Sequence, residues 1–144
     1  MQEDGGWGEK EDYEHIDETL KYMKKNYNID RNRMYLAGFS AGGKFVYHVA
    51  KNRPNEFHGL ASICAMLNND AKDIVSKVNK KFKFYIVNGE IDNVMPPENG
   101  KTSADYLRKN GFKNLVYIEA GGLGHDQPGS IAYKAIQYFE GETP

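Results

Sequence analysis

Three residues of types that work together in nucleophilic catalysis lie far apart in the chain: Ser40, Asp92 and His125. A serine hydroxyl becomes a nucleophile when a neighbouring imidazole takes its proton, and a carboxylate fixes the tautomer of that imidazole. Each of the three follows an apolar run and lies in a segment rich in glycine or asparagine. The residue types and their settings therefore predict acyl transfer through a serine nucleophile.

Ser40 is the middle residue of Gly38-Phe39-Ser40-Ala41-Gly42, a G-x-S-x-G pattern between a predicted strand and a predicted helix. At so sharp a turn the serine backbone is strained by about 1–3 kcal/mol, and the residues two positions away must be small. We expect the N–H of Ala41 to face the oxyanion of a tetrahedral intermediate. Phe39 is expected to line the acyl site, whereas Trp7 suits core packing or the surface better.

The loop 88–96 offers two carboxylates, and the loop 121–128 carries the histidine. Asp92 is the better orienting carboxylate, because Glu90 lies nearer the end of the preceding strand. His125 follows the last predicted strand and is placed to reach over the end of the sheet. The other histidines fall on predicted helices or at the start of a strand and receive no chemical role: His15, His48 and His58.

A metal site built from Asp92, His125 and Asp126 is an alternative use of these loops. The chain has neither the H-x-x-x-H nor the C-x-x-C spacing typical of zinc ligands, so we predict no metal and no cofactor. The single cysteine, Cys64, excludes an internal disulfide. It lies in an apolar run and is predicted to be a small buried hydrophobe.

Two periodicities alternate along the chain and predict helices between short strands. Apolar residues at three- and four-residue spacing predict helices, whereas short apolar or β-branched runs ended by glycine or asparagine predict strands. The helices are expected at 12–27, from 44 to about 53, 70–79, 98–110 and from 131 onward, and the strands at 34–37, 58–64, 82–87 and 115–118.

Strands separated by helices predict an α/β fold with a parallel sheet of about four strands and helices on both faces. We expect residues 1–144 to form a single domain. In such a sheet the loops at the carboxyl ends of the strands meet at one edge, where chemistry gathers. The loops after residues 38, 88 and 119 are therefore expected to come together, in the chain order Ser, Asp, His.

With these motifs in place, the sequence resembles the α/β-hydrolase superfamily, and within it the esterases akin to polyhydroxybutyrate depolymerases and feruloyl esterases. The resemblance runs through residues 27–43, Asn88-Gly89-Glu90-Ile91-Asp92 and Gly124-His125-Asp126-Gln127-Pro128. It implies hydrolysis of carboxylic esters, in a small molecule or a polymer. Ser40 would be the nucleophile, His125 the general base and then acid, and Asp92 the orienting carboxylate.

The resemblance covers only the C-terminal half of that fold, with four of its eight strands. It implies a chain truncated on its N-terminal side, without the loop that gives a second oxyanion N–H. The strand near residues 34–38 would then be an open edge, and an apolar open edge favours pairing with another chain. We therefore expect a homo-oligomer or a partner that pairs through this strand.

Two other functions remain open at this point. A serine peptidase of the prolyl-oligopeptidase kind uses the same three residues. A non-catalytic truncated hydrolase fold, kept for binding or assembly, would explain the missing half.

Composition excludes several broad classes. The 144 residues carry a net charge of −1 with no basic block, which argues against nucleic-acid binding. No apolar run approaches the length that spans a bilayer, and the acidic, glycine-rich residues 1–9 are unlike a signal peptide, so the compartment is left open.

Overall fold

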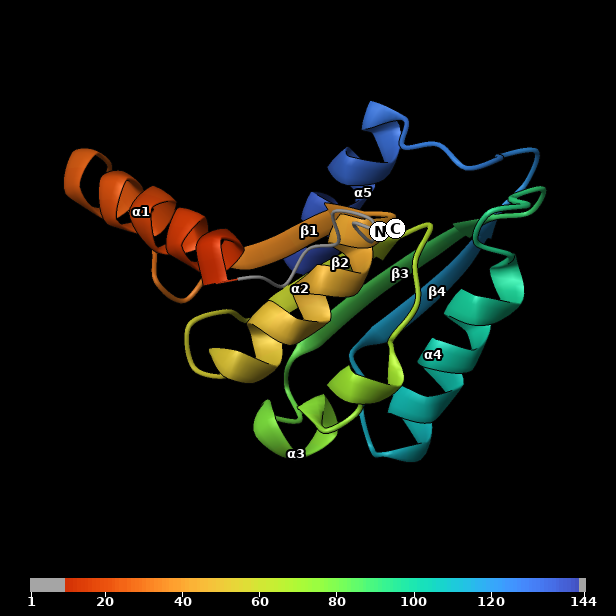
Figure 1. The fold of residues 1–144 in the computed structure, drawn as a ribbon, viewed down its shortest axis with the longest axis horizontal. Helices are drawn as coiled ribbons and strands as arrows, with labels where there is room; N and C mark the ends of the chain where they lie inside the picture. The colour runs from red at the N-terminus through yellow and green to blue at the C-terminus, as the bar shows by residue number, and fades with distance from the viewer. Residues whose placement is uncertain (1–9, 143–144) are drawn as a thin grey trace, which may run out of the picture.

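The computed structural model describes residues 10–142 and contains alternating helices and strands (Figure 1). Trp7 lies outside the described residues. In chain order the elements are α1 (Lys10–Asn26), β1 (Tyr35–Phe39), α2 (Ala41–Asn52), β2 (Gly59–Ile63), the 3₁₀ turn η1 (Asn69–Ala71), α3 (Ile74–Lys77), β3 (Lys83–Gly89), α4 (Pro97–Lys109), β4 (Leu115–Ala120) and α5 (Gly129–Phe139).

The four strands form one parallel sheet in the order β1-β2-β3-β4, which confirms the predicted α/β class. One register row runs across it through Leu36, Leu60, Phe84 and Leu115. The helix expected over 70–79 is shorter than predicted. The segment forms η1 and then α3, which ends at Lys77 because Val78 already has an extended backbone.

Helices cover both faces of the sheet, and each face has its own apolar core. Leu60, Phe84 and Ile86 point to the face covered by α2, α3 and α4. Their neighbours along the same strands, such as Tyr85 and Val87, point to the opposite face and pack against α5. This two-residue alternation makes β2 and β3 apolar on both sides, as expected for strands in the middle of a parallel sheet.

Proline and glycine set the ends of the helices. The helix expected to stop before Pro54 ends at Asn52. After α4, Gly111 has a φ of 87° and its N–H donates to the carbonyl of Arg108. The N–H of Phe112 donates to the carbonyl of Leu107, so α4 ends in a Schellman motif with the predicted glycine at its centre.

Helix α1 extends beyond β1, at the side of the sheet where no further strand is described (Figure 1). None of its residues is fully buried. Tyr13 contacts the ring of Phe45 edge-on, and Asp17 pairs with Arg53 at 2.5 Å. Helix α1 is therefore held to α2 mainly by peripheral contacts. None of the described helices is long and apolar enough to cross a membrane.

Candidate active site

The sheet brings Ser40, Asp92 and His125 into one hydrogen-bonded row. Ser40 directly follows β1, Asp92 lies in the loop after β3, and His125 lies in the loop after β4. The Oγ of Ser40 is 2.9 Å from Nε2 of His125. On the other side of the ring, Nδ1 is 2.8 Å from Oδ2 of Asp92. Because the strands are parallel, their carboxyl ends lie at one edge of the sheet, and the loops that follow them place all three side chains there.

The backbone of Ser40 adopts a conformation that L-residues rarely take, with φ 53° and ψ −118°. Its own N–H donates to the carbonyl of Ile63 at the end of β2 at 2.9 Å, which fixes the turn to the neighbouring strand. A Cβ on Gly38 would lie 2.2 Å from the carbonyl oxygen of Gly42, so only glycine fits there. This is the strained strand-to-helix turn that the G-x-S-x-G pattern predicts.

Ala41 is the first residue of α2. Its N–H is therefore among the four at a helix start that have no intrahelical partner. It follows the serine at the positive end of the helix dipole, where an N–H stabilises developing negative charge.

The carboxylate of Asp92 is buried and fully engaged. The residue is 2% exposed, and its Oδ1 accepts the N–H groups of Val94 at 2.8 Å and Met95 at 2.7 Å. Burial alone would raise the pKa of Asp92. The hydrogen bonds from Met95, His125 and Val94 outweigh burial and hold the pKa below its ordinary value. Asp92 is therefore an anion at neutral pH, as the hydrogen bond to the Nδ1–H of an imidazole requires.

Comparison with known proteins gives the family of the chain. The family model described as phospholipase/carboxylesterase matches residues 8–139. The chain belongs to this phospholipase/carboxylesterase family. The predicted resemblance to α/β-hydrolase esterases is thereby confirmed.

Curated relatives of this family member include esterases and thioesterases. A bifunctional acetylxylan esterase/xylanase of Neocallimastix patriciarum is 34% identical over 84 residues, 58% of this chain and 12% of that protein. An acyl-protein thioesterase 1 homolog of Dictyostelium discoideum is 26% identical over 111 residues, 76% of this chain and 49% of that protein. The chain thus spans about half or less of the length of the curated relatives that it matches.

Solved structures show the same fold. A thermostable esterase superposes with a TM-score of 0.72 at 20% identity, covering 94% of this chain and 38% of the other. A ferulic acid esterase from Anaeromyces mucronatus superposes with a TM-score of 0.69 at 19% identity, covering 88% and 51% respectively. These likenesses establish the fold of this phospholipase/carboxylesterase family member.

Phe39, the residue expected to line the acyl site, lies beside the proposed base. Its ring centroid is 4.9 Å from that of His125. Phe39 also lines an apolar hollow of about 350 Å³, together with Leu36, Gly42 and Val46. This hollow begins at the serine turn and runs along the side of β1 that faces α1.

Two sets of contacts at this site were not found from the sequence. The N–H groups of Val94 and Met95 bind Asp92, although an aspartate followed by a turn is a recognisable signal for such bonds. The carboxylate of Glu90 accepts the N–H of Gly122 at 2.8 Å, and no sequence signal indicated that pairing.

The predicted burial of Cys64 is confirmed, since the residue is 0% exposed. Its Sγ lies 3.5 Å from the carbonyl oxygen of Asp126. Burial raises the pKa of the thiol, and the nearby Asp92 carboxylate acts in the same direction. The thiol is therefore a poor nucleophile.

Potential metal-ligand atoms of Cys64, Asp92 and His125 lie within 4.8 Å of one another. Hydrogen bonding accounts for this cluster without a metal, because the carboxylate and the imidazole bind each other. The carboxylate of Asp126, part of the alternative metal site, instead accepts the N–H of Gln127.

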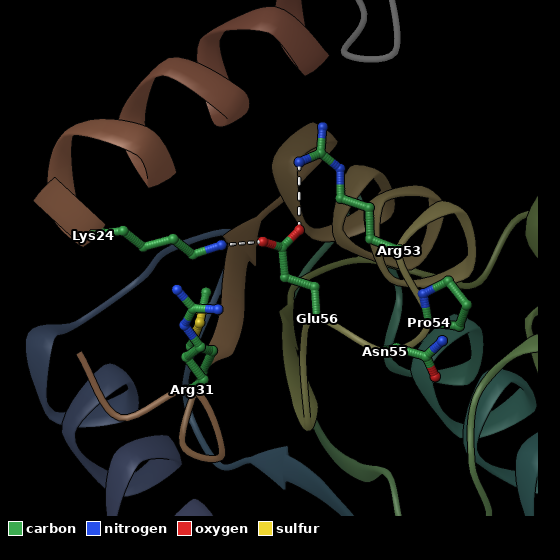
Figure 2. A pocket seen from close by; sticks show the side chains of 7 residues that line it. Lys24, Arg31, Arg53, Pro54, Asn55 and Glu56 are labelled. Atoms are coloured by element: carbon green, nitrogen blue, oxygen red, sulfur yellow. Dashed lines mark hydrogen bonds and ion pairs between the residues drawn. The ribbon is translucent and has the colours of Figure 1, made fainter.

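A larger hollow, of about 450 Å³, lies at the opposite end of the sheet. Met34, just before β1, lines it, so it faces the amino ends of the strands. Figure 2 shows Glu56 in its wall between Lys24 of α1 and Arg53 after α2, with N–O distances of 2.6 and 3.6 Å. This hollow therefore lies at the end of the sheet away from Ser40, and we assign it no part in ester hydrolysis.

Proposed function

We propose that this chain is a serine hydrolase that cleaves carboxylic esters through an acyl-enzyme on Ser40. The observation that carries the proposal is the unbroken row from Ser40 through His125 to Asp92, with hydrogen bonds of 2.9 and 2.8 Å. Membership of the phospholipase/carboxylesterase family supports the same reaction class. The substrate class is a carboxylic ester, in a small molecule or in a polymer.

In the acylation step, the Oγ of Ser40 attacks the ester carbonyl carbon while Nε2 of His125 takes the hydroxyl proton. The carbonyl oxygen becomes an oxyanion, which the N–H of Ala41 stabilises. The buried Asp92 carboxylate stabilises the imidazolium that forms. The intermediate then expels the alcohol, which leaves with the proton from Nε2, and the acyl group remains on Ser40.

In the deacylation step, water attacks the acyl carbon and gives a proton to the same nitrogen of His125. The second tetrahedral intermediate collapses, the acid leaves, and the proton returns to Ser40. These steps need no cofactor, because every proton moves between the hydroxyl, the imidazole, the substrate and the attacking water.

A fluorophosphonate probe and a short-chain p-nitrophenyl ester test the proposal. We expect Ser40 to be labelled and the ester to be hydrolysed, and both signals to disappear in Ser40→Ala. Ser130→Ala, which alters an exposed serine in α5, serves as the control and should behave as wild type. Absence of both labelling and turnover in folded wild-type protein would instead favour the non-catalytic alternative, and cleavage of peptide bonds with no ester turnover would favour the peptidase.

We also propose that the chain forms one domain whose sheet is completed at β1 by a strand from a complementary hydrolase segment. Among the described strands, β1 pairs with β2 alone. Two apolar hollows, of about 350 and 290 Å³, lie beside it and share Ile16 and Leu36 in their walls. The chain spans 49% of the thioesterase homolog that it matches, and the greater length of that relative supports such a complementary segment.

A strand suits this place better than an acyl chain. The outward N–H and C=O groups of an edge strand need hydrogen-bond partners, and a hydrocarbon would bury them without any. A strand pairs with these groups and places alternate apolar side chains in the hollows beside Leu36.

Sedimentation and amide hydrogen exchange test the pairing. The chain alone should sediment as a monomer whose β1 amides exchange faster than those of β2 and β3. A dimer with slowly exchanging β1 amides would make a second copy the occupant instead. A monomer with β1 as protected as β2 would show that the edge needs no partner.

A further inference from the structure

The loop that carries His125 rests on the residues just after β3. The N–H of Glu90 donates to the carbonyl of Ala120, and the N–H of Ile91 donates to the carbonyl of Leu123, each at 3.0 Å. A Cβ on Gly89 would lie 2.3 Å from the carbonyl oxygen of Leu123. The two backbones therefore touch at a point where only glycine fits.

The side chain of Glu90 adds a bond to the tip of this loop. Ala120 to Leu123 form a tight turn, in which the N–H of Leu123 donates to the carbonyl of Ala120 at 3.2 Å. Gly122 occupies the left-handed region of the turn, with a φ of 68°. Its N–H donates to Oε2 of Glu90 at 2.8 Å.

The same short segment therefore holds the proposed base in two ways. Asp92 binds the imidazole itself, whereas Glu90 binds the turn three residues before His125. Proton transfer from Ser40 needs Nε2 within hydrogen-bond reach of Oγ, and a displacement of about 1 Å at a reacting group costs on the order of 10² in rate. Loss of the Glu90 bond would free the tip of the loop and lower the fraction of molecules in which this geometry is met.

We propose that Glu90 is a positioning residue, which holds the histidine loop so that Nε2 of His125 stays within reach of Ser40. This inference rests on the proposed hydrolase function. Glu90 contacts the backbone of the loop and not the reacting atoms, and its role differs from that of Asp92. The role needs an acceptor oxygen rather than a negative charge, since the partner is a backbone N–H.

Three variants test the role in ester hydrolysis. Glu90→Ala removes the acceptor and should lower kcat about tenfold, with KM unchanged within about twofold. Glu90→Gln keeps an acceptor oxygen and should return kcat to within about threefold of wild type. Glu119→Ala, which alters an exposed glutamate of neighbouring β4, is the matched control and should leave both constants unchanged. Wild-type kcat in Glu90→Ala, or equal losses in the alanine and glutamine variants, would overturn the inference.

A second measurement does not depend on turnover. The proton of His125 shared with Asp92 should give a low-field ¹H NMR signal that broadens in Glu90→Ala and persists in Glu90→Gln. Ester turnover absent from wild type, with this NMR pattern present, would reject the proposed function and keep the positioning role. An unchanged signal in Glu90→Ala would reject the positioning role, whatever the turnover.

Discussion

The carboxyl ends of the strands and the outer side of β1 differ in how completely they are built. At the first region, which we call the rim, Ser40, Asp92 and His125 bind one another and the backbone around them. At the second, the β1 edge, Leu36 is only partly buried, whereas its register partners Leu60 and Phe84 are 0% exposed. The three side chains therefore lie at the end of an edge strand. β1 pairs with β2 on one side, and no described strand pairs with it on the other.

This difference separates two kinds of requirement. Residues at the rim make close contacts and hydrogen bonds that a single added or removed atom would break. Substitutions there should therefore abolish activity or destabilise the fold. Apolar side chains at the β1 edge are only partly buried, so substitutions there should have smaller effects on stability. Four predictions test this distinction.

The largest expected effect is at Asp92. Asp92→Asn should leave the fold intact and lower kcat by about 10⁴, because an amide favours the wrong imidazole tautomer. Steady-state ester hydrolysis measures the loss. Asp126→Asn, on the histidine loop, is the control and should stay within about threefold of wild type. Near-normal turnover in Asp92→Asn would assign the orienting role to another carboxylate.

A backbone clash at the rim comes next. Gly38→Ala places a Cβ 2.2 Å from the carbonyl oxygen of Gly42, which cannot move without disturbing α2. We expect a loss of about 3 kcal/mol in the free energy of unfolding, measured by urea denaturation. Gly124→Ala, where an added Cβ meets no atom within 4 Å, should change it by less than about 1 kcal/mol. Equal effects at the two glycines would contradict the steric account of the serine turn.

The register row across β1 and β2 compares the closed and open sides directly. Leu60→Ala should cost about 3 kcal/mol of unfolding free energy, because it leaves a cavity in a fully buried layer. Leu36→Ala removes the same atoms at a partly buried position and should cost about half as much. Urea denaturation of both variants gives the ratio. A loss at Leu36 that equals the loss at Leu60 would mean that the β1 edge is covered in solution.

The smallest expected effect is the pH dependence of the contribution that Asp92 makes to the free energy of unfolding. Its pKa is lower in the folded state, so its stabilisation is complete above the ordinary carboxyl pKa of about 3.9 and is lost as pH falls through the folded-state pKa. The difference in unfolding free energy between wild type and Asp92→Asn should be constant from pH 7 to 5 and shrink below about pH 4. A difference that grows in acid would give the opposite sign to the pKa shift.

Much of the fold was predictable, because the residues that end its strands and helices are recognisable from the local sequence. The G-x-S-x-G turn, the Asn88-Gly89 stop after β3 and Gly111 after α4 each carry a backbone requirement that a sequence displays. Alternating strands and helices then imply a parallel sheet, and a parallel sheet brings its carboxyl-end loops together. The proximity of Ser40, Asp92 and His125 follows from that topology.

The remaining features depend on contacts between loops, which have no periodic signal. The bond from Gly122 to Glu90 joins residues whose turns meet only in three dimensions. The left-handed backbone of Cys64, with a φ of 46°, is likewise set by its place after β2 and not by its residue type. The end of α3 at Lys77 depends on where the backbone becomes extended, at Val78, and residue propensities do not determine that position.

The hydrogen bond from the N–H of Ser40 to the carbonyl of Ile63 has a practical consequence. It ties the proposed nucleophile to the end of β2, so we expect the serine to keep its conformation whether or not a strand pairs with β1. Covalent labelling of Ser40 would then be the same with and without a strand paired at β1, whereas the rate of ester turnover would increase on pairing. A split-enzyme assay built on this chain could read both signals from one sample and follow reassembly through their ratio.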